Sequence, residues 1–439
     1  MRLQTLSKDE IIKKYLELEK ENEKLKKAKE ALEKELRKYK NPNTPSSAHP
    51  FLKPAVQTAQ QGRRGAPKGH HGSTRPWLVP HEERYIRGKG CPNCHCKDVD
   101  VVYQRHQQVE EMPPDIRPQT VDVIRDVCQC NRCGLKFMAK DGKTPLQGRF
   151  GVNLMVLVIF LKFIVRGVLR KTSSFLDASF ALKLAPASVQ TIIERAAKAG
   201  EMEYAALKLK IKAANLLYID ETSFRVLGRN WWVWAFRSDT DLLLVIRNSR
   251  GNNILEEILG KDYAGIVVCD CWRAYDFLSN ATLQRCWAHL LRKSKELENV
   301  SGKHFHKKLS KLFEQIIKFN KKERTQQQRR HKYEQMTTEL QKTTAYYSRY
   351  EECQPVTKYI NFHLESWFTC IRHAGVQPTN NYAEQAIRET VLVRKIIGAF
   401  RSEKGTKTYE TLASLIATWQ YQKLDIKKEL HRMLTTNLC

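Results

Sequence analysis

The sequence predicts an α/β protein with smaller modules in front of the α/β part, and three observations support this fold class. At roughly one domain per 150 residues, a chain of 439 residues is long enough for several modules. Apolar residues make up 41% of the chain, which is enough for a hydrophobic core. The order strand, strand, strand, helix and strand follows from the apolar patterns between residues 214 and 270. This order resembles the start of a ribonuclease H-like sheet.

Charge indicates the kind of partner. The chain has 76 Lys and Arg against 47 Asp and Glu, a net charge of +29, which favours a polyanion such as double-stranded DNA. The longest apolar run, residues 154–167, is too short to span a membrane and contains Lys162. The first residues lack the apolar stretch of a secretory signal. We therefore expect a cytoplasmic protein, nucleoid-associated when bound to DNA, with reduced cysteines and no membrane partner.

Residues 1–40 predict a coiled coil. Every seventh residue is apolar in the series Ile11, Leu18, Leu25, Leu32 and Tyr39, and the companion series is Tyr15, Asn22, Lys29 and Leu36. A polar Asn within such a seam often selects two strands. We expect a homodimer or higher oligomer, and the alternative is a single solvated helix laid on the body of the protein.

Residues 41–80 predict a flexible basic linker, because the segment is rich in Pro, Gly, Ser and basic residues. Arg63 and Arg64 are candidates for contacts with DNA phosphates. The alternative is a solvated tether without a DNA contact.

Residues 81–145 predict a zinc-binding, ribbon-like module. Two CxxC pairs, Cys91 with Cys94 and Cys130 with Cys133, supply the four thiolates of a tetrahedral structural Zn²⁺ site. His95, Cys96 and Cys128 remain alternative ligands, since CPNCHC departs from a plain knuckle. A redox pair or cysteines without metal are the other interpretations.

Residues 150–205 predict helices in a helix-turn-helix arrangement. The last helix begins near Pro186, and its apolar stripe is Val189, Ile192, Ile193 and Ala196. Its polar face carries Gln190, Arg195 and Lys198, which are candidates for DNA contacts in a major groove. An ordinary small helical bundle gives the same pattern, and Ala185 stands where a Ser or Thr cap would suit the helix.

Two aspartates follow apolar strands in the part of the chain that we assign to an α/β domain, residues 211–400. One strand is expected to end at Asp220 and another at Asp270. Side by side, such strands bring two carboxylates together, and hard oxygen ligands suit Mg²⁺ or Mn²⁺. The alternative is that each Asp is only the polar end of a strand. Glu221 should point to the opposite face of the sheet and should not be a ligand.

A third acidic residue, Glu384, lies in the first turn of a predicted amphipathic helix. Ala383, Ile387 and Val391 would pack that helix on the sheet with its first turn at the sheet edge. Arg388 is one turn further along and is a candidate for a phosphate contact. As an alternative role for Glu384, Asn381 and Glu384 have the spacing of a capping box.

Six motifs carry a resemblance to a known family: YIDET, NWWVWAF, VVCDCWRAY, CWAHLLRKSKEL, TNNYAEQAIR and RKIIGAFRSEKGTKTYETLASLIAT. In combination they resemble the transposases of the IS66 insertion-sequence family. The resemblance extends over nearly the whole chain, including the N-terminal seam and the CxxC pairs. One departure is Ser223, where Gly is more usual after DET.

The resemblance implies a DDE triad of Asp220, Asp270 and Glu384 that holds two Mg²⁺ or Mn²⁺ ions, with Asp220 bridging them. Such an enzyme cleaves at the ends of the element and joins the 3′-OH ends to target DNA. The resemblance also implies a helical insertion, at about residues 289–375 here, and small accessory proteins encoded beside the transposase. Residues 401–439 are expected to form a C-terminal helical region. Cys286 and His289 resemble a CxxH motif of DDE enzymes, and either a DNA contact or a packed His explains it.

Two alternatives remain for the function. A metal-dependent DNA nuclease of the same fold would cut without joining. A non-catalytic DNA-binding regulator would use only the zinc module and the helix-turn-helix, and it leaves the three acidic residues unexplained.

Overall fold

The computed structural model describes residues 17–19, 21–25, 28–30, 79, 86, 92–98, 100, 102–103 and 116–439. The chain divides into two units, Met1–Asp115 and Ile116–Cys439, which are described separately. In the first unit the described residues between 17 and 30 are helical, and Leu18 and Leu25 are exposed. Arg63, Arg64 and Cys91, with nearly all of the predicted linker, lie outside the described residues.

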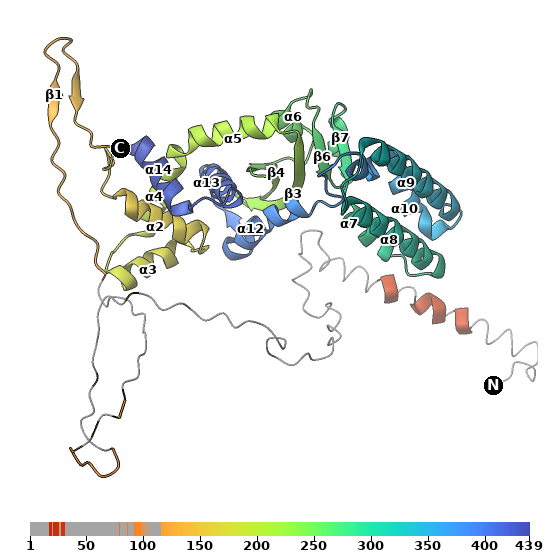
Figure 1. Cartoon of the computed structure of the whole chain (residues 1–439), viewed down its shortest axis with the longest axis horizontal. Helices are drawn as coiled ribbons and strands as arrows, with labels where there is room; N and C mark the ends of the chain where they lie inside the picture. The colour runs from red at the N-terminus through yellow and green to blue at the C-terminus, as the bar shows by residue number, and fades with distance from the viewer. Residues whose placement is uncertain are drawn as a thin grey trace, which may run out of the picture. The chain divides into compact units, whose positions relative to one another are not determined.

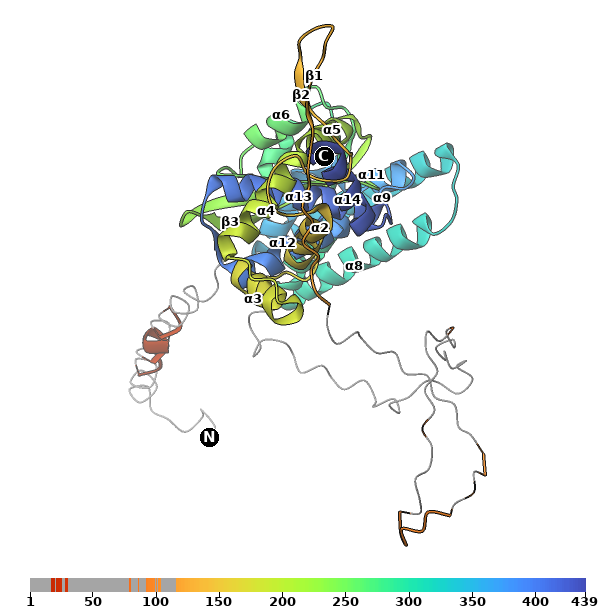
Figure 2. The same ribbon diagram turned by 90° about the vertical axis from the view of Figure 1, so that its left-hand side faces the viewer.

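The second unit is a mixed α/β fold (Figures 1 and 2). Its strands are β1 Val127–Gln129, β2 Lys136–Met138, β3 Leu216–Val226, β4 Arg229–Arg237, β5 Leu242–Arg247, β6 Ile266–Cys269, β7 Thr282–Arg285 and β8 Ala399–Phe400. Its helices are α2 Val152–Phe163, α3 Leu169–Phe180, α4 Pro186–Ala199, α5 Glu201–Ala213, α6 Asn253–Leu259, α7 Trp287–Lys295, α8 Val300–Asn320, α9 Gln326–Tyr347, α10 Gln354–Asn361, α11 Thr369–Arg372, α12 Asn381–Ile397, α13 Glu403–Tyr421 and α14 Ile426–Leu438. None of the helices that the structure describes is long and apolar enough to cross a membrane.

The main sheet has the strand order β5-β4-β3-β6-β7, and the short β8 also pairs with β3. Strands β3, β4 and β5 are antiparallel neighbours, whereas β6 and β7 run parallel to β3. With α6 between β5 and β6, this confirms the predicted order of three strands, a helix and a strand. The sheet is therefore mixed and has β3 near its middle.

Strand β3 does not end at Asp220, and that prediction was wrong. The strand runs on to Val226 because β4 pairs with it from Tyr218 to Val226. The two strands are joined through Leu227 and Gly228, whose φ angles are +51° and +76°. Positive φ at both central residues is what a two-residue hairpin turn with the right twist requires. Asp220 consequently lies in the interior of a strand.

Helices cover both faces of the sheet. Side chains of one face, among them Ile219 and Trp234, share a hydrophobic core with α2–α6, α13 and α14. Val233 and Ala235 face the opposite way and pack with α12 and α13. The period of two along β4 explains this division, because successive side chains point to opposite faces.

Helix α13 also covers the open edge of the sheet at β5. Three side chains spaced four residues apart, Glu410, Ser414 and Thr418, accept hydrogen bonds from backbone N–H groups of β5 at 2.9–3.0 Å. These polar residues occupy one stripe of a largely buried helix. These N–H groups of the edge strand, which would otherwise be unpaired, are thereby hydrogen-bonded within the chain.

The helices before the sheet form as predicted, with α4 beginning at Pro186 and its apolar stripe buried. Helix α4 contacts α2, α3, α13 and α14. The same core contains residues from α2, from the sheet and from α14. The segments expected at 150–205, 211–400 and 401–439 are thus packed around one shared core.

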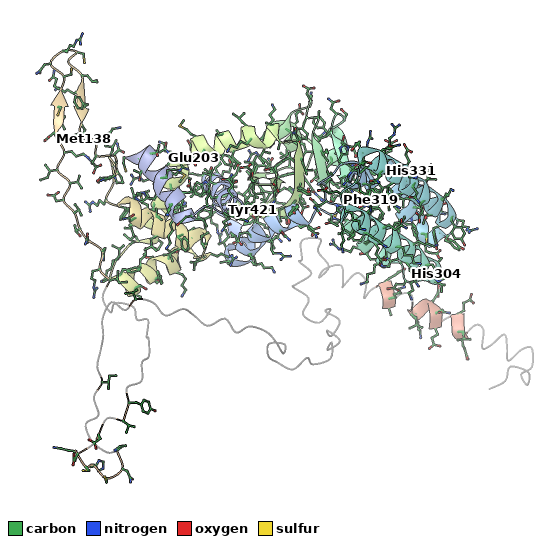
Figure 3. The ribbon with its side chains drawn as sticks, in the orientation of Figure 1. Met138, Glu203, His304, Phe319, His331 and Tyr421 are labelled. Carbon is green, nitrogen blue, oxygen red and sulfur yellow. The ribbon has the colours of Figure 1, made fainter. Side chains whose placement is uncertain are left out.

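The predicted insertion between residues 289 and 375 is helical, and its hydrophobic core also includes Tyr218 of β3 and Val268 of β6. Trp287, Phe305, Trp367 and Phe368 are buried in that core, and Figure 1 shows α7–α10 together at one end of the sheet. Figure 3 labels His304 and Phe319 on α8 and His331 on α9. The exposed face of α8 carries Lys303, Lys307, Lys308, Lys311 and Lys318.

Candidate active site

The site forms where β3 lacks a strand partner on one side. Strand β6 pairs with β3 only along Leu216–Tyr218, and β8 pairs with it only at Arg225 and Val226. The residues between these pairings include Asp220. The gap gives a side chain from the middle of β3 room to meet groups from other elements.

Asp270 follows the last residue of β6, as predicted. Its side chain accepts a hydrogen bond from the backbone N–H of Trp272 at 2.8 Å. Its backbone carbonyl accepts one from the buried guanidinium of Arg285 at 2.7 Å. Asp270 is thus held at the carboxyl end of β6, the strand beside β3.

Helix α12 brings the third carboxylate into the gap. Asn380, the residue before the helix, donates from Nδ2 to the backbone carbonyl of Ile219 at 2.7 Å. Further along the helix, Arg394 donates to the hydroxyl of Ser223 at 3.3 Å. The two contacts hold α12 against β3, so Glu384 in the first turn of α12 lies beside Asp220.

The capping-box explanation of Glu384 is wrong. The residue at the cap position is Asn380 rather than Asn381, and no side chain caps the helix. The backbone N–H of Glu384 bonds to the carbonyl of Asn380 as in an ordinary helix. Its Oε1 is buried and has no hydrogen-bond partner among the described residues. Glu384 therefore does not cap the helix, which was the structural role that its spacing from Asn381 had suggested.

Electrostatics connect the three carboxylates. Burial raises the pKa of Asp220 well above its ordinary value, and the negative charges of Glu221, Asp270 and Glu384 raise it further. Such a cluster is unfavourable unless a cation or protons compensate it. Asp270 and Glu384 therefore lie close enough to Asp220 for their charges to raise its pKa.

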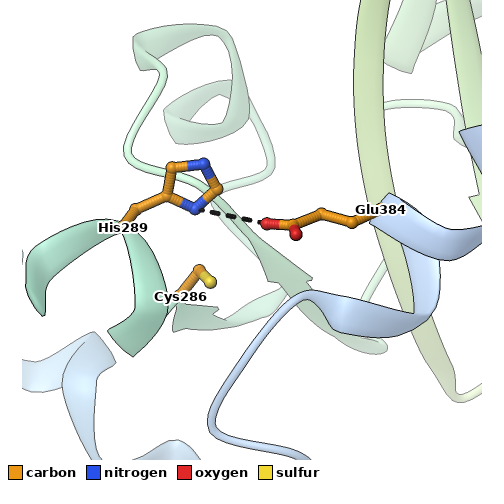
Figure 4. Close-up of side chains that lie close together, drawn as sticks. All are labelled: Cys286, His289 and Glu384. Carbon is orange, nitrogen blue, oxygen red and sulfur yellow. Dashed lines mark ion pairs between the residues drawn. The ribbon is translucent and has the colours of Figure 1, made fainter. Parts of the chain in front are cut away.

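His289 and Cys286 border this site from α7 (Figure 4). The Nδ1 atom of His289 is 3.9 Å from Oε1 of Glu384. Burial lowers the pKa of His289, although Asp270 and Glu384 oppose the shift. Cys286 is buried, and its sulfur accepts a hydrogen bond from the backbone N–H of Asn380 at 3.2 Å.

Glu221 is engaged elsewhere. It accepts hydrogen bonds from Arg250 at 2.8 Å and from the hydroxyl of Tyr275 at 2.7 Å. The guanidinium of Arg250 lies over the rings of Trp232 and Trp272, at 4.7 and 4.2 Å from their centroids. Burial and the charge of Asp270 raise the pKa of Glu221, while Tyr275 and Arg250 lower it.

Comparison with known proteins identifies the family. Residues 147–408, more than half of the chain, match the model of the transposase IS66 family, and this range contains all three carboxylates. The chain belongs to the IS66 transposase family. This is a family of DDE transposases, which are enzymes of DNA transposition that use divalent metal ions.

One curated relative is similar over most of its length. It is the uncharacterized protein y4hP of Sinorhizobium fredii (strain NBRC 101917 / NGR234), 23% identical over 407 residues. The similarity covers 82% of this chain and 73% of the relative.

The structure describes four of the residues predicted to contact DNA, Gln190, Arg195 and Lys198 on α4 and Arg388 on α12. On α4, Arg195 donates to the backbone carbonyl of Gln147 at 2.6 Å, Gln190 donates to Glu194 at 2.9 Å, and Lys198 is exposed. Arg388 is exposed and borders a cavity of about 460 Å³ between α2, α12 and α13, whose lining does not include Glu384. A DNA contact by these residues of an IS66 transposase stays a prediction.

The predicted zinc ligands are divided between the two units. Cys130 and Cys133 lie in the turn between β1 and β2, where hydrogen bonds from the backbone N–H groups of Cys133 and Arg132 lower the pKa of Cys130. Cys94 is exposed in a turn of the first unit, and Cys91 lies outside the described residues. The zinc site of this IS66 member stays a prediction.

Residue-level reasoning missed Asn380 and Arg250. Asn380 is part of the TNN motif, so its position before the acidic helix was visible in the sequence. The hydrogen bond from Asn380 to Ile219 could not be predicted, because the two residues are separated by 161 positions. Arg250 lies in a loop, and no sequence pattern indicated its contact with Glu221.

Proposed function

We propose that this IS66 family member is a DNA transposase that cleaves at insertion-sequence ends and joins the resulting 3′-OH ends to target DNA. The observation that supports this most strongly is the convergence of Asp220, Asp270 and Glu384 beside the gap in β3. The strand order β5-β4-β3-β6-β7 supports a ribonuclease H-like catalytic domain.

The donor set fits divalent metal ions. The three carboxylates, one of them with a buried oxygen that has no hydrogen-bond partner among the described residues, are the hard oxygen ligands that Mg²⁺ and Mn²⁺ prefer. Asp220 would be shared between two ions, with Asp270 and Glu384 each holding one. When bound, the ions would activate the attacking oxygen and stabilise the leaving oxygen of an in-line displacement.

Other residues keep the carboxylates in place. Asn380 and Arg394 hold α12 against β3, while the backbone N–H of Trp272 and the guanidinium of Arg285 hold Asp270. One oxygen of Glu384, Oε1, is buried and has no hydrogen-bond donor among the described residues. Orientation of this kind reduces the reorganisation that the reaction requires.

DNA would be held by positively charged surfaces. Residues 301–350 contain 13 Lys and Arg against 4 Glu, and five exposed lysines lie along α8. A row of lysines suits the phosphate backbone, independently of base sequence. In the first unit, we propose dimerisation or higher assembly through residues 1–40. We also propose a structural Zn²⁺ held by Cys91, Cys94, Cys130 and Cys133.

The experiment is a strand-transfer assay with the full-length protein, Mg²⁺, DNA carrying the ends of the element, and a target plasmid. A transposase cuts and joins, a nuclease cuts only, and a regulator binds without cutting. We expect Asp220→Asn, Asp270→Asn and Glu384→Gln each to abolish cutting while end binding persists.

Glu389→Gln is the matched control on the same helix. Glu389 is exposed and pairs with Arg166 at 2.6 Å, so its loss should leave cutting intact. Cutting by Glu384→Gln at the wild-type rate would contradict the proposal.

A further inference from the structure

Cys286, His289 and Glu384 form a second constellation at the edge of the carboxylate site. One ligand atom from each residue, a sulfur, a ring nitrogen and a carboxylate oxygen, lies within 4.8 Å of the other two. The three side chains come from two elements, since Cys286 and His289 belong to the start of α7 and Glu384 to the start of α12 (Figure 4).

Two of these ligand atoms are buried and have no hydrogen-bond partner in the part of the chain that the structure describes. They are Nδ1 of His289 and Oε1 of Glu384, which face each other at 3.9 Å. Buried polar atoms in proteins are nearly always hydrogen-bonded, so an unpaired couple of this kind requires an explanation. A cation between the two atoms would satisfy both.

The chemistry of the three ligands selects a class of ion. Thiolate, imidazole and carboxylate together are typical of zinc, whereas Mg²⁺ rarely accepts sulfur or nitrogen. Ligands of a tetrahedral zinc ion stand roughly 3.3–3.8 Å apart, given bond lengths of about 2.0–2.3 Å. The three ligand atoms now lie within 4.8 Å of one another. A small side-chain adjustment would bring their distances into the range for zinc and leave a fourth coordination position open.

The surroundings allow an ion to enter and hold the sulfur in place. The side chains of His289 and Glu384 are 28% and 34% exposed, whereas Cys286 is buried. The backbone N–H of Asn380 donates to the sulfur at 3.2 Å, which opposes the rise that burial causes in the pKa of Cys286. The ion would displace the thiol proton of Cys286, as binding to thiols generally requires.

We propose that Cys286, His289 and Glu384 bind a zinc-type ion, and that this binding inhibits DNA cleavage because it takes Glu384 away from the Mg²⁺ centre. The inhibitory part rests on the proposed function, whereas the binding part does not. Zn²⁺ held by Glu384 would reduce the negative charge of the carboxylate cluster and add positive charge beside it, so the two ions oppose each other's binding.

Binding is tested with Co²⁺, which absorbs strongly when a thiolate coordinates it. The full-length wild type, Cys286→Ser and His289→Ala are titrated, and Cys353→Ser, which removes another buried cysteine, is the control. We expect Cys286→Ser to lose one equivalent of thiolate absorption and His289→Ala to bind that equivalent about 10- to 100-fold more weakly. Thermal unfolding verifies that each variant is folded. Spectra of both variants that equal the wild-type spectrum would overturn the site.

Inhibition is tested by adding Zn²⁺ to the Mg²⁺-dependent cleavage reaction, with each protein compared with its own rate without Zn²⁺. We expect Cys286→Ser to need about tenfold more Zn²⁺ than the wild type for the same inhibition. Equal sensitivity of the two proteins would overturn the inhibitory role. If no protein cleaves under any condition but the Cys286-dependent absorption is present, the proposed function fails and the binding site stands.

Discussion

The side-chain amide of Asn380 donates a hydrogen bond to the backbone carbonyl of Ile219, 2.7 Å away. Ile219 is the neighbour of Asp220 on β3, and Asn380 lies four residues before Glu384. This hydrogen bond therefore ties the strand that carries the first carboxylate to the start of the helix that carries the third.

Replacement of Asn380 by Ala should weaken the metal centre without unfolding the protein. Loss of the bond frees the start of α12, so Glu384 is held less firmly. We expect the Mg²⁺ concentration for half-maximal cleavage to rise about tenfold, as for other groups that orient metal ligands. Asn320→Ala is the control, because Asn320 makes a similar bond to the carbonyl of Cys370 far from the carboxylates. A reduced rate with unchanged Mg²⁺ dependence would argue against a positioning role.

The stability of the metal-free protein should depend on Asp220. Its pKa in the folded state lies above the ordinary 3.8, so the folded state favours the protonated form. That contribution is complete below pH 3.8 and is lost as the pH rises through the folded-state pKa. We expect the melting temperature in EDTA to fall across this range and Mg²⁺ to restore it.

Asp220→Asn removes the charge and provides the comparison. At neutral pH without metal, we expect this variant to be more stable than the wild type by on the order of 1 kcal/mol. Glu221 also has a raised pKa, so some pH dependence should remain. If the variant is less stable than the wild type at every pH, the charge of Asp220 does not destabilise the metal-free protein.

Arg250 should stabilise the fold through its ion pair with Glu221. The Glu221 side chain is 1% exposed, and removing one partner of a buried pair costs about 3–5 kcal/mol. Because 33% of the Arg250 side chain is exposed, we expect roughly 2–3 kcal/mol for Arg250→Ala in chemical denaturation. Arg432→Ala breaks an exposed pair with Glu203 and should lose at most about 1 kcal/mol. Equal effects of the two changes would refute the buried-pair account.

The exposed leucines of the first unit should control assembly. Leu18 and Leu25 are 59% and 62% exposed, and both belong to the heptad series. We expect Leu18→Glu with Leu25→Glu to shift the protein to a smaller oligomer in light scattering, since charges in a coiled-coil seam oppose association. An unchanged mass would favour the single-helix alternative.

The local patterns predicted most of the second unit. Apolar runs gave the order of three strands, a helix and a strand, and helical spacing gave the stripe of α4. Asp270 lies at the end of β6 because that strand is short and parallel. The sequence placed Asp220 at the end of a strand, whereas the structure places it inside a longer strand.

What could not be predicted depends on contacts between distant residues. The length of β3 depends on its pairing with β4 and β8, and the fit of α13 depends on an edge strand more than 160 positions away. The four-residue spacing of Glu410, Ser414 and Thr418 was a visible signal. Its meaning follows only once β5 is known to be the edge of the sheet.

Equilibrium binding of Mn²⁺, followed by electron paramagnetic resonance, tests the shared metal centre most directly. The comparison is between the wild type, Asp220→Asn, Asp270→Asn, Glu384→Gln and the control Glu389→Gln. If the three carboxylates share one centre, each of the first three changes weakens binding at the same site about tenfold or more, and the control binds as the wild type does. Mn²⁺ binding that is unchanged in the three variants, or lost from unrelated sites, would contradict the account.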